Sequence, residues 1–313
     1  MTRTVDRLVI ALPDVAERHL LGPLPLRAAV VLFAESVDAL WPDLSEVEVI
    51  VPGIVGRHRF AAGIAGMPRL RLIQTVTAGV DFLRGRVPPE VTVCNARGAF
   101  DAGMAEWVVG AILAFRRGLL VSRDAQAEHA WRPTDIALVE GATVVVLGLG
   151  SIGSAVAHRL RPFGVDLVGV GRTARPGVAG LEDLDALLPR ADVLVDLLPL
   201  TADTLGFLDA RRLALLPDGA LLVNAGRGRT VDTAALVAEA SSGRISAALD
   251  VTDPEPLPPD HPLWAMPNVL VTPHIAGDSP AGVARAWAIA AEGIGRYAAG
   301  QEPATRVPDY LLR

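Results

Sequence analysis

The chain has 313 residues, of which 51% are hydrophobic and 20% charged, so it can bury the cores of two ordinary domains. A net charge of −6 and an aromatic content of 4% argue against a nucleic-acid partner, which needs a basic surface and stacking side chains. All 29 basic residues are arginine. The absence of lysine excludes Schiff-base and pyridoxal-phosphate enzymes and Walker-type phosphate loops.

Cysteine content and hydropathy indicate the compartment. Cys94 is the only cysteine, which excludes an intrachain disulfide and a cysteine-rich zinc site, and we expect no bound metal. Residues 1–20 carry early charges and only a short apolar run, unlike a signal peptide. The most apolar helical segment, 104–115, falls short of the roughly 20 residues that a membrane span needs. These features predict a cytoplasmic protein without a membrane partner.

Short apolar runs alternate with helical stretches along the whole chain, which predicts parallel sheets covered on both faces. Strands are expected first at 7–12, 28–34, 47–51, 70–76 and 91–95, followed by a helix over 102–117. Later strands are expected at 142–148, 166–171, 192–198, 220–225, 246–251 and 268–273, before a last helix over 279–299.

The order of these elements predicts two α/β domains with Rossmann-like or flavodoxin-like parallel sheets. Residues 1–97 and 277–313 form the expected substrate-binding domain, and residues 98–276 the dinucleotide-binding domain, with the active site in the cleft between them. The helix over 102–117 is apolar around most of its circumference, so it needs cover on two sides. We therefore expect a homodimer that buries this helix.

Gly148, Gly150 and Gly153 have the G-x-G-x-x-G spacing of a nucleotide-binding turn. The motif follows a β-branched strand and opens an apolar-periodic helix, which is the context that gives it weight. Glycines at these places allow a tight turn and let backbone N–H groups approach a pyrophosphate at the positive end of the helix.

The segment after the next strand indicates which nucleotide binds. NAD-binding chains usually carry an acidic residue there for the ribose 2′-hydroxyl, whereas this chain has Gly171 followed by Arg172, Thr173 and Arg175. A guanidinium can bind the 2′-phosphate of NADP with charge-assisted hydrogen bonds, and Thr173 adds a hydroxyl donor. The segment therefore favours NADP over NAD, although the arginines could also be plain surface residues.

Three polar residues follow three successive strands, at the edge where ligands of parallel sheets gather. Arg227 can hold a substrate carboxylate or keto oxygen, and His274 can deliver a proton to that oxygen as hydride arrives. Glu255 beside the histidine would favour the imidazolium and fix its tautomer. Each residue alone could be structural, but their convergence downstream of a nucleotide turn favours hydride exchange with a carbonyl next to a carboxylate.

At these residues the chain resembles the D-isomer-specific 2-hydroxyacid dehydrogenases, over about residues 75–300. The similar blocks, in order, are GLGSIG, LLPLTADT, VNAGRGRTVD, GRISAALDVTDPEPLP, HPLW and NVLVTPHIAG. The resemblance implies that Arg227, Glu255 and His274 are the catalytic residues. It also implies a substrate loop at Ala78 and Gly79, and cofactor contacts at Ser151, Ile152, Pro199, Thr204, Ala225, Gly226, Asp250 and Gly277.

Three functions remain open. The first is an NADPH-preferring reductase of small 2-keto acids, with glyoxylate and hydroxypyruvate as the nearest substrates. The second is an NAD-dependent dehydrogenase of a larger D-2-hydroxy acid. The third is a nucleotide-sensing corepressor, since the family includes such members, but the sequence shows none of their extra tails.

Overall fold

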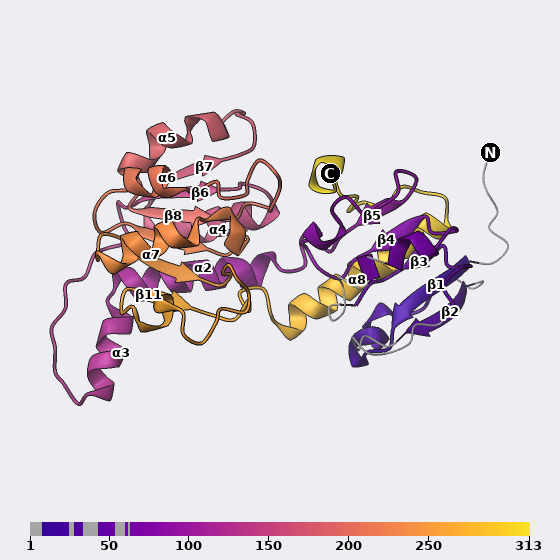
Figure 1. The fold of residues 1–313 in the computed structure, drawn as a ribbon, viewed down its shortest axis with the longest axis horizontal. Coiled ribbons are helices and arrows are strands. Elements are labelled where there is room, and N and C mark those ends of the chain that lie inside the picture. Colours follow the sequence, from indigo (N-terminus) through magenta and orange to yellow (C-terminus); the bar gives the residue numbers. More distant parts are fainter. Residues whose placement is uncertain (1–7, 25–27, 34–42, 54–59, 62) are drawn as a thin grey trace. The chain divides into compact units, whose positions relative to one another are not determined.

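The computed structural model describes residues 8–24, 28–33, 43–53, 60–61 and 63–313. Residues 7 and 34, at the ends of two expected strands, lie outside this part. The chain divides into two compact units, one of Met1–Phe100 with Asp278–Arg313 and one of Asp101–Gly277. Both units are built on parallel sheets, which confirms the predicted α/β fold class (Figure 1).

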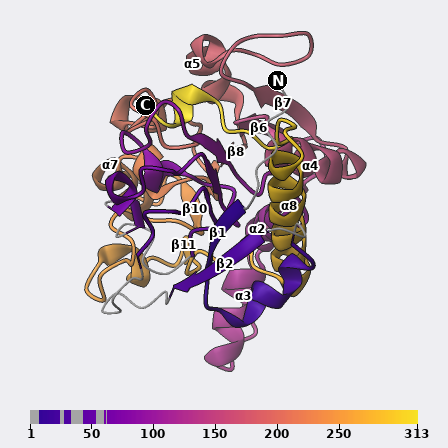
Figure 2. The same ribbon diagram turned by 90° about the vertical axis from the view of Figure 1, so that its right-hand side faces the viewer.

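The sheet of the first unit has, in its described residues, the strand order β2-β1-β3-β4-β5. The strands are β1 (Leu8–Pro13), β2 (Ala28–Phe33), β3 (Val49–Ile50), β4 (Leu72–Gln74) and β5 (Thr92–Cys94). Ile10 and Leu72 face the helix α8 (Pro280–Ala298), whereas the next residues in each strand, Ala11 and Ile73, join a second core on the opposite face. Figure 2 shows α8 beside this sheet.

The described part of the second unit contains a sheet of order β11-β10-β9-β8-β6-β7. The strands are β6 (Thr143–Leu147), β7 (Asp166–Val170), β8 (Val193–Asp196), β9 (Leu221–Asn224), β10 (Ser246–Leu249) and β11 (Val269–Val271). Val144 and Val146 pack in one core layer, and Val145 and Leu147 in the other. Burial on both faces explains why the strands read as continuous apolar runs.

Helices cover both faces of this second sheet. They are α2 (Asp101–Arg116), α4 (Ser151–Leu160), α5 (Leu184–Leu187), α6 (Ala210–Leu215) and α7 (Thr233–Ser241). The further helix α3 (Leu119–Ala127) packs against α2. Two short 3₁₀ turns, η7 (Gly228–Thr230) and η8 (Pro262–Ala265), lie in the loops after β9 and β10. Among the described residues, no helix has the length and apolar character needed to cross a membrane.

Candidate active site

The predicted site residues of the second unit follow strands whose carboxyl ends are in register. Leu147 pairs with Asp196, Asp196 with Asn224, Asn224 with Leu249, and Leu249 with Val271. The loops that follow therefore leave the sheet at the same edge. This register places the glycine-rich turn, the Arg227 loop, the Glu255 loop and the His274 loop along one edge, whereas Ala78 and Gly79 belong to the first unit.

The glycine-rich turn has the shape of a pyrophosphate cradle. Gly148 has a φ of +99°, and a Cβ built there would lie 2.9 Å from the carbonyl oxygen of Leu197. A Cβ on Gly153 would meet the carbonyl oxygen of Gly148. Helix α4 begins directly after this turn, at Ser151, with no side chain capping its first N–H groups. A dinucleotide pyrophosphate fits this site, because the N–H groups and the helix dipole both favour an anion.

Ser151 also makes a contact that its place in the glycine-rich motif does not predict. Its hydroxyl donates a hydrogen bond to the carboxylate of Asp101, the first residue of α2. The side chain is thus held against the neighbouring helix, and the backbone of α4 provides the donors of the cradle.

The arginine segment folds back over the glycine-rich turn. The Arg175 guanidinium donates from Nη2 to the carbonyl oxygen of Leu149 at 3.0 Å. A Cβ on Gly171 would lie only 2.7 Å from Arg175 Nη1, so this cation fills the place where an acidic side chain would begin. A backbone pair between Arg175 and Val178 closes the turn that allows this fold. Arg172 and Thr173 are exposed beside it.

Asp250 organises the loop that carries His274. Its carboxylate accepts hydrogen bonds from the Thr272 hydroxyl at 2.6 Å and from the backbone N–H groups of Ile275 and Ala276 at 2.8 and 2.9 Å. Its backbone oxygen accepts from the N–H of His274. The family resemblance implies a cofactor contact for Asp250 and did not predict this scaffold, for which an acidic residue at a strand end is the only signal.

His274 and Glu255 form a close polar pair. His274 Nδ1 lies 2.6 Å from Glu255 Oε1, and both side chains are a little under half exposed. Because an ionised carboxylate can only accept, Nδ1 carries the proton that is donated, which leaves Nε2 as the second ring nitrogen. His274 has a φ of +56°, an unusual conformation for a non-glycine residue, and the hydrogen bonds to Asp250 hold it there.

Arg227 lies on a tightly confined backbone at the same edge. Its guanidinium donates from Nη1 to the carbonyl oxygen of Gly226 at 2.7 Å, and its side chain is half-buried. A Cβ on Gly226 would lie 2.8 Å from the carbonyl oxygen of Leu198, and one on Gly228 would overlap that of Thr252. Only glycine therefore fits on either side of Arg227.

Two other parts of the predicted site have local hydrogen bonds. Thr204 accepts from the Thr201 N–H at 2.7 Å and donates to the Pro199 carbonyl oxygen at 2.6 Å, which closes the loop after β8. In the first unit, Asn95 Nδ2 donates to the carbonyl oxygen of Ala78 at 2.7 Å. In that peptide the N–H of Gly79 points the opposite way from the pinned carbonyl.

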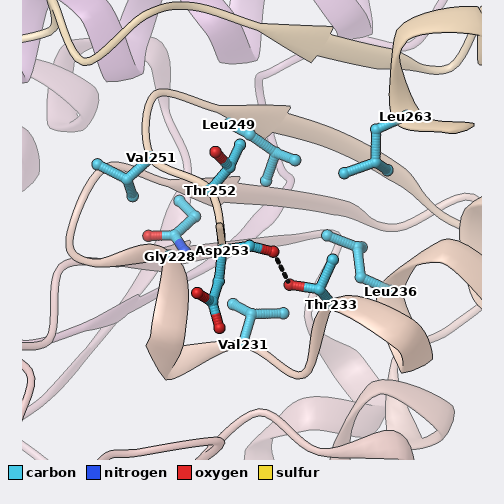
Figure 3. Close-up of a pocket in the computed structure, with 10 residues that line it drawn as sticks. Gly228, Val231, Thr233, Leu236, Leu249, Val251, Thr252, Asp253 and Leu263 are labelled. Atoms are coloured by element: carbon cyan, nitrogen blue, oxygen red, sulfur yellow. Dashed lines mark hydrogen bonds between the residues drawn. The ribbon is translucent and has the colours of Figure 1, made fainter. Parts of the chain in front are cut away.

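A small cavity lies under the Arg227 loop, lined by Gly228, Val231, Thr252 and Asp253 among others (Figure 3). The Thr233 hydroxyl bridges it with a hydrogen bond to the Asp253 carbonyl oxygen. Its volume of ≈ 10 Å³ suffices for at most one water molecule, so it is not a substrate pocket. Within the described residues, no cluster of three or more histidine, cysteine, aspartate or glutamate side chains could hold a metal ion.

Comparison with known proteins identifies the family. The family model for the NAD binding domain of D-isomer specific 2-hydroxyacid dehydrogenases matches residues 109–276 of this chain. A glyoxylate reductase of Thermofilum pendens is 34% identical over 264 residues, which are 79% of this chain and 77% of that protein.

Solved structures of other proteins are similar to this chain over nearly its full length. A D-isomer specific 2-hydroxyacid dehydrogenase of Xanthobacter autotrophicus Py2, in complex with NADPH and MES, is 34% identical, with a TM-score of 0.81 over 95% of this chain and 98% of that one. An NADPH-dependent glyoxylate/hydroxypyruvate reductase of Sinorhizobium meliloti, in complex with NADP and sulfate, is 29% identical, with a TM-score of 0.84 over 98% and 99%. The chain therefore belongs to the D-isomer-specific 2-hydroxyacid dehydrogenases, a family of NAD(P)-dependent oxidoreductases.

Proposed function

We propose that this protein is an NADPH-preferring reductase of small 2-keto acids, with glyoxylate and hydroxypyruvate as its substrates. The observation that carries the proposal is the His274–Glu255 pair, at 2.6 Å, on the same sheet edge as the glycine-rich turn. Two relatives support the substrate class, since one is named a glyoxylate reductase and another a glyoxylate/hydroxypyruvate reductase.

Each side chain has a role in the proposed reaction. Bound NADPH supplies the hydride. Arg227 binds the substrate carboxylate or keto oxygen through its planar guanidinium. His274 donates the Nε2 proton to the keto oxygen, since Nδ1 is engaged with Glu255. We also assign Ala78 and Gly79 to substrate binding, as the family resemblance implies, and Asn95 fixes the orientation of the peptide that joins them.

The positive charge beside Gly171 supports the preference for NADPH. Arg175 lies where an acidic ribose ligand would begin, and Arg172 and Thr173 stand exposed next to it. A 2′-phosphate gains charge-assisted hydrogen bonds from such a cluster, whereas a 2′-hydroxyl gains little. The relatives from Xanthobacter autotrophicus and Sinorhizobium meliloti were solved with NADPH and NADP, respectively.

The cofactor contacts of the proposal come from loops that leave the sheet of the second unit at one edge. The residues that we assign to NADPH are Gly148, Gly150, Ser151, Ile152, Gly153, Arg172, Thr173, Pro199, Thr204, Ala225, Gly226, Asp250 and Gly277. Of these, Asp250 acts in part through the loop that it organises.

Glu255→Gln tests the orientation of the catalytic histidine. Glutamine keeps an oxygen that can accept the Nδ1 proton but loses the charge that stabilises the imidazolium. We expect turnover to fall about 10- to 100-fold, less than after loss of His274 itself, with the KM for NADPH unchanged. Glu302→Gln, an exposed carboxylate paired with Arg306, is the control. Native turnover in Glu255→Gln would show that the pair has no part in the reaction.

A panel of 2-keto acids tests the substrate class. Steady-state reduction of glyoxylate, hydroxypyruvate, pyruvate and a branched 2-keto acid is measured with saturating NADPH, and oxidation of D- and L-glycerate with NADP. We expect the highest kcat/KM for glyoxylate and hydroxypyruvate and oxidation of the D isomer alone. Preference for the branched acid would support the larger-substrate alternative, and no turnover on any acid would refute the proposal.

We also propose a homodimer, formed along α2 and the surface that follows it. The apolar side chains of α2 are mostly buried or half-buried within the unit, but the next segments expose Leu119, Val121, Trp131, Ile136 and Leu138. The Trp131 side chain is 99% exposed, which is costly for a large aromatic ring. Several large apolar side chains exposed along one short stretch of chain, 119–138, support an interface there.

Trp131→Asp tests this assembly. We expect wild type to be a dimer at micromolar concentration and Trp131→Asp to shift it to monomer, because a charge would be buried in the interface. Multi-angle light scattering measures the mass. Trp264→Asp, at an exposed tryptophan outside this surface, should stay dimeric. A wild-type monomer would contradict the proposal.

A further inference from the structure

A buried carboxyl group at the end of β8 has no part in the reaction described so far. Asp196 is fully buried, and no ion pair in the described part of the chain includes it. Its Oδ1 accepts from the N–H of Leu198 at 3.0 Å, and its Oδ2 lies 2.6 Å from the hydroxyl of Thr230. Burial raises the pKa of Asp196 to about 6, against the hydrogen bonds from Thr230 and Leu198, which lower it.

The Thr230 hydroxyl lies between two acceptors. Its Oγ1 is 2.6 Å from Asp196 Oδ2 and also 2.6 Å from the backbone carbonyl oxygen of Arg227. A hydroxyl has one hydrogen to donate, so it can satisfy only one of two acceptors. Both contacts are hydrogen bonds only when Asp196 is protonated and donates to Thr230, which in turn donates to Arg227. When Asp196 is ionised, its carboxylate is the stronger acceptor because it is charged. The Thr230 hydroxyl then donates its hydrogen to Asp196 and no longer to the Arg227 carbonyl oxygen.

The backbone carbonyl oxygen of Arg227 accepts more than the Thr230 hydroxyl. It also accepts from Asn224 Nδ2 and from the Thr230 N–H, both at 3.1 Å. The backbone of the neighbouring Gly226 and Gly228 packs closely against Leu198 and Thr252, which confines the loop on either side of Arg227. Hydrogen bonds to the Arg227 carbonyl orient this peptide within the confined loop, and the shortest of them comes from the Thr230 hydroxyl.

The groups facing Asp196 leave few other sources of pH dependence. It is flanked in the sheet by Leu147 on β6 and Asn224 on β9, and contacted from the following loops by Leu198 and Thr230. None of these four groups titrates. The same hydrogen-bond network leads through Thr230 to Arg227, whose guanidinium donates to the carbonyl oxygen of Gly226.

We propose that Asp196 is a positioning residue for substrate binding, which in its protonated form holds the Arg227 backbone through the Thr230 hydroxyl. Ionisation of Asp196 withdraws the Thr230 hydrogen bond from Arg227, so affinity for the 2-keto acid falls as the pH rises. The inference rests on the proposed role of Arg227 as the substrate-binding arginine.

Asp196→Asn tests the positioning role, because asparagine imitates the protonated acid. Its amide donates to Thr230, its oxygen accepts from Leu198, and it does not titrate. The KM for glyoxylate and kcat are measured from pH 5 to pH 8 at saturating NADPH. In wild type we expect KM to rise about 3- to 10-fold, with a midpoint near pH 6, in keeping with the loss of one hydrogen bond. In Asp196→Asn, KM should keep its low-pH value and the step should vanish, with kcat similar in both proteins.

Thr230 provides the second arm of the experiment. Thr230→Val removes the hydroxyl at nearly constant volume and should give the high KM at every pH. Thr230→Ser should restore both the low KM and its pH step, a rescue that a purely structural role of the methyl group would not give. Infrared difference spectra supply an independent readout: a protonated-carboxyl band that titrates near pH 6 should be present in wild type and missing in Asp196→Asn.

The outcomes separate this inference from the proposed function. A wild type that reduces glyoxylate with the same pH profile of KM as Asp196→Asn would overturn the positioning role and leave the proposed function standing. Absence of the carboxyl band at pH 5 would overturn it as well. A wild type that reduces no 2-keto acid would refute both.

Discussion

Replacing His274 with glutamine should lower the turnover of 2-keto acid reduction by about two to four orders of magnitude. Glutamine is similar in size and polarity but cannot deliver a proton to the keto oxygen. The dissociation constant for NADPH should stay near the wild-type value, because the glycine-rich turn and the arginine segment are made by other loops. Single-turnover kinetics and a fluorescence titration of NADPH measure the two quantities.

His129→Gln is a matched control for this variant. His129 is an exposed histidine on the segment after α3, and it has the same φ of +56° as His274. Both variants therefore place glutamine in the left-handed region, with a similar backbone cost. Near-native turnover in His129→Gln, next to a large loss in His274→Gln, assigns the loss to chemistry. Near-native turnover in His274→Gln would remove this residue from the mechanism.

The second large effect concerns the cofactor. A guanidinium contact to the 2′-phosphate is worth about 1.5–3 kcal/mol, so Arg172→Ala should lower the preference for NADPH by roughly ten- to more than a hundredfold. The KM for NADH should hardly change. Arg190→Ala, at an exposed arginine that ends the 3₁₀ helix Leu188–Arg190, should leave the ratio of the two catalytic efficiencies unaltered. If the ratio of the catalytic efficiencies with NADPH and NADH were the same in Arg172→Ala as in wild type, Arg172 would be a surface residue with no part in cofactor choice.

The position of Arg175 refines the design of a cofactor switch. An aspartate at Gly171 would meet the Arg175 guanidinium, since even its Cβ would lie 2.7 Å from Nη1. The new carboxylate would be engaged in an ion pair and would be a poor acceptor for the ribose of NADH. We therefore expect Gly171→Asp alone to weaken NADPH binding with little gain for NADH, and the double variant with Arg175→Ala to gain NADH activity.

The fold and the order of the site loops could be predicted because they depend on local patterns. Continuous apolar runs, bounded by polar residues, predicted strands that the structure places in two parallel sheets. The glycine spacing predicted the turn before α4, and the apolar stretch over 102–117 predicted α2. The pairing of Glu255 with His274 was expected from residues on adjacent loops and is present at 2.6 Å.

The contacts that escaped prediction depend on residues far apart in the sequence. The Arg175 side chain returns to Leu149, 26 residues earlier, because of a turn closed by Val178. Asp196 finds its partner Thr230 34 residues later, and the only trace in the sequence is an acid within the apolar run VLVDLL. The homodimer, the cytoplasmic location and the identity of the 2-keto acid stay predictions, since no local pattern encodes the shape of a pocket or a partner surface.

The most direct test of the proposed function is a comparison of NADPH and NADH in the reduction of glyoxylate by the wild-type protein. Catalytic efficiencies for the two cofactors are measured at a saturating concentration of the keto acid and at one ionic strength, because charge contacts to a phosphate weaken with salt. We predict reduction of glyoxylate with a kcat/KM at least about tenfold higher for NADPH than for NADH. A preference for NADH, or the absence of glyoxylate reduction with both cofactors, would contradict the account.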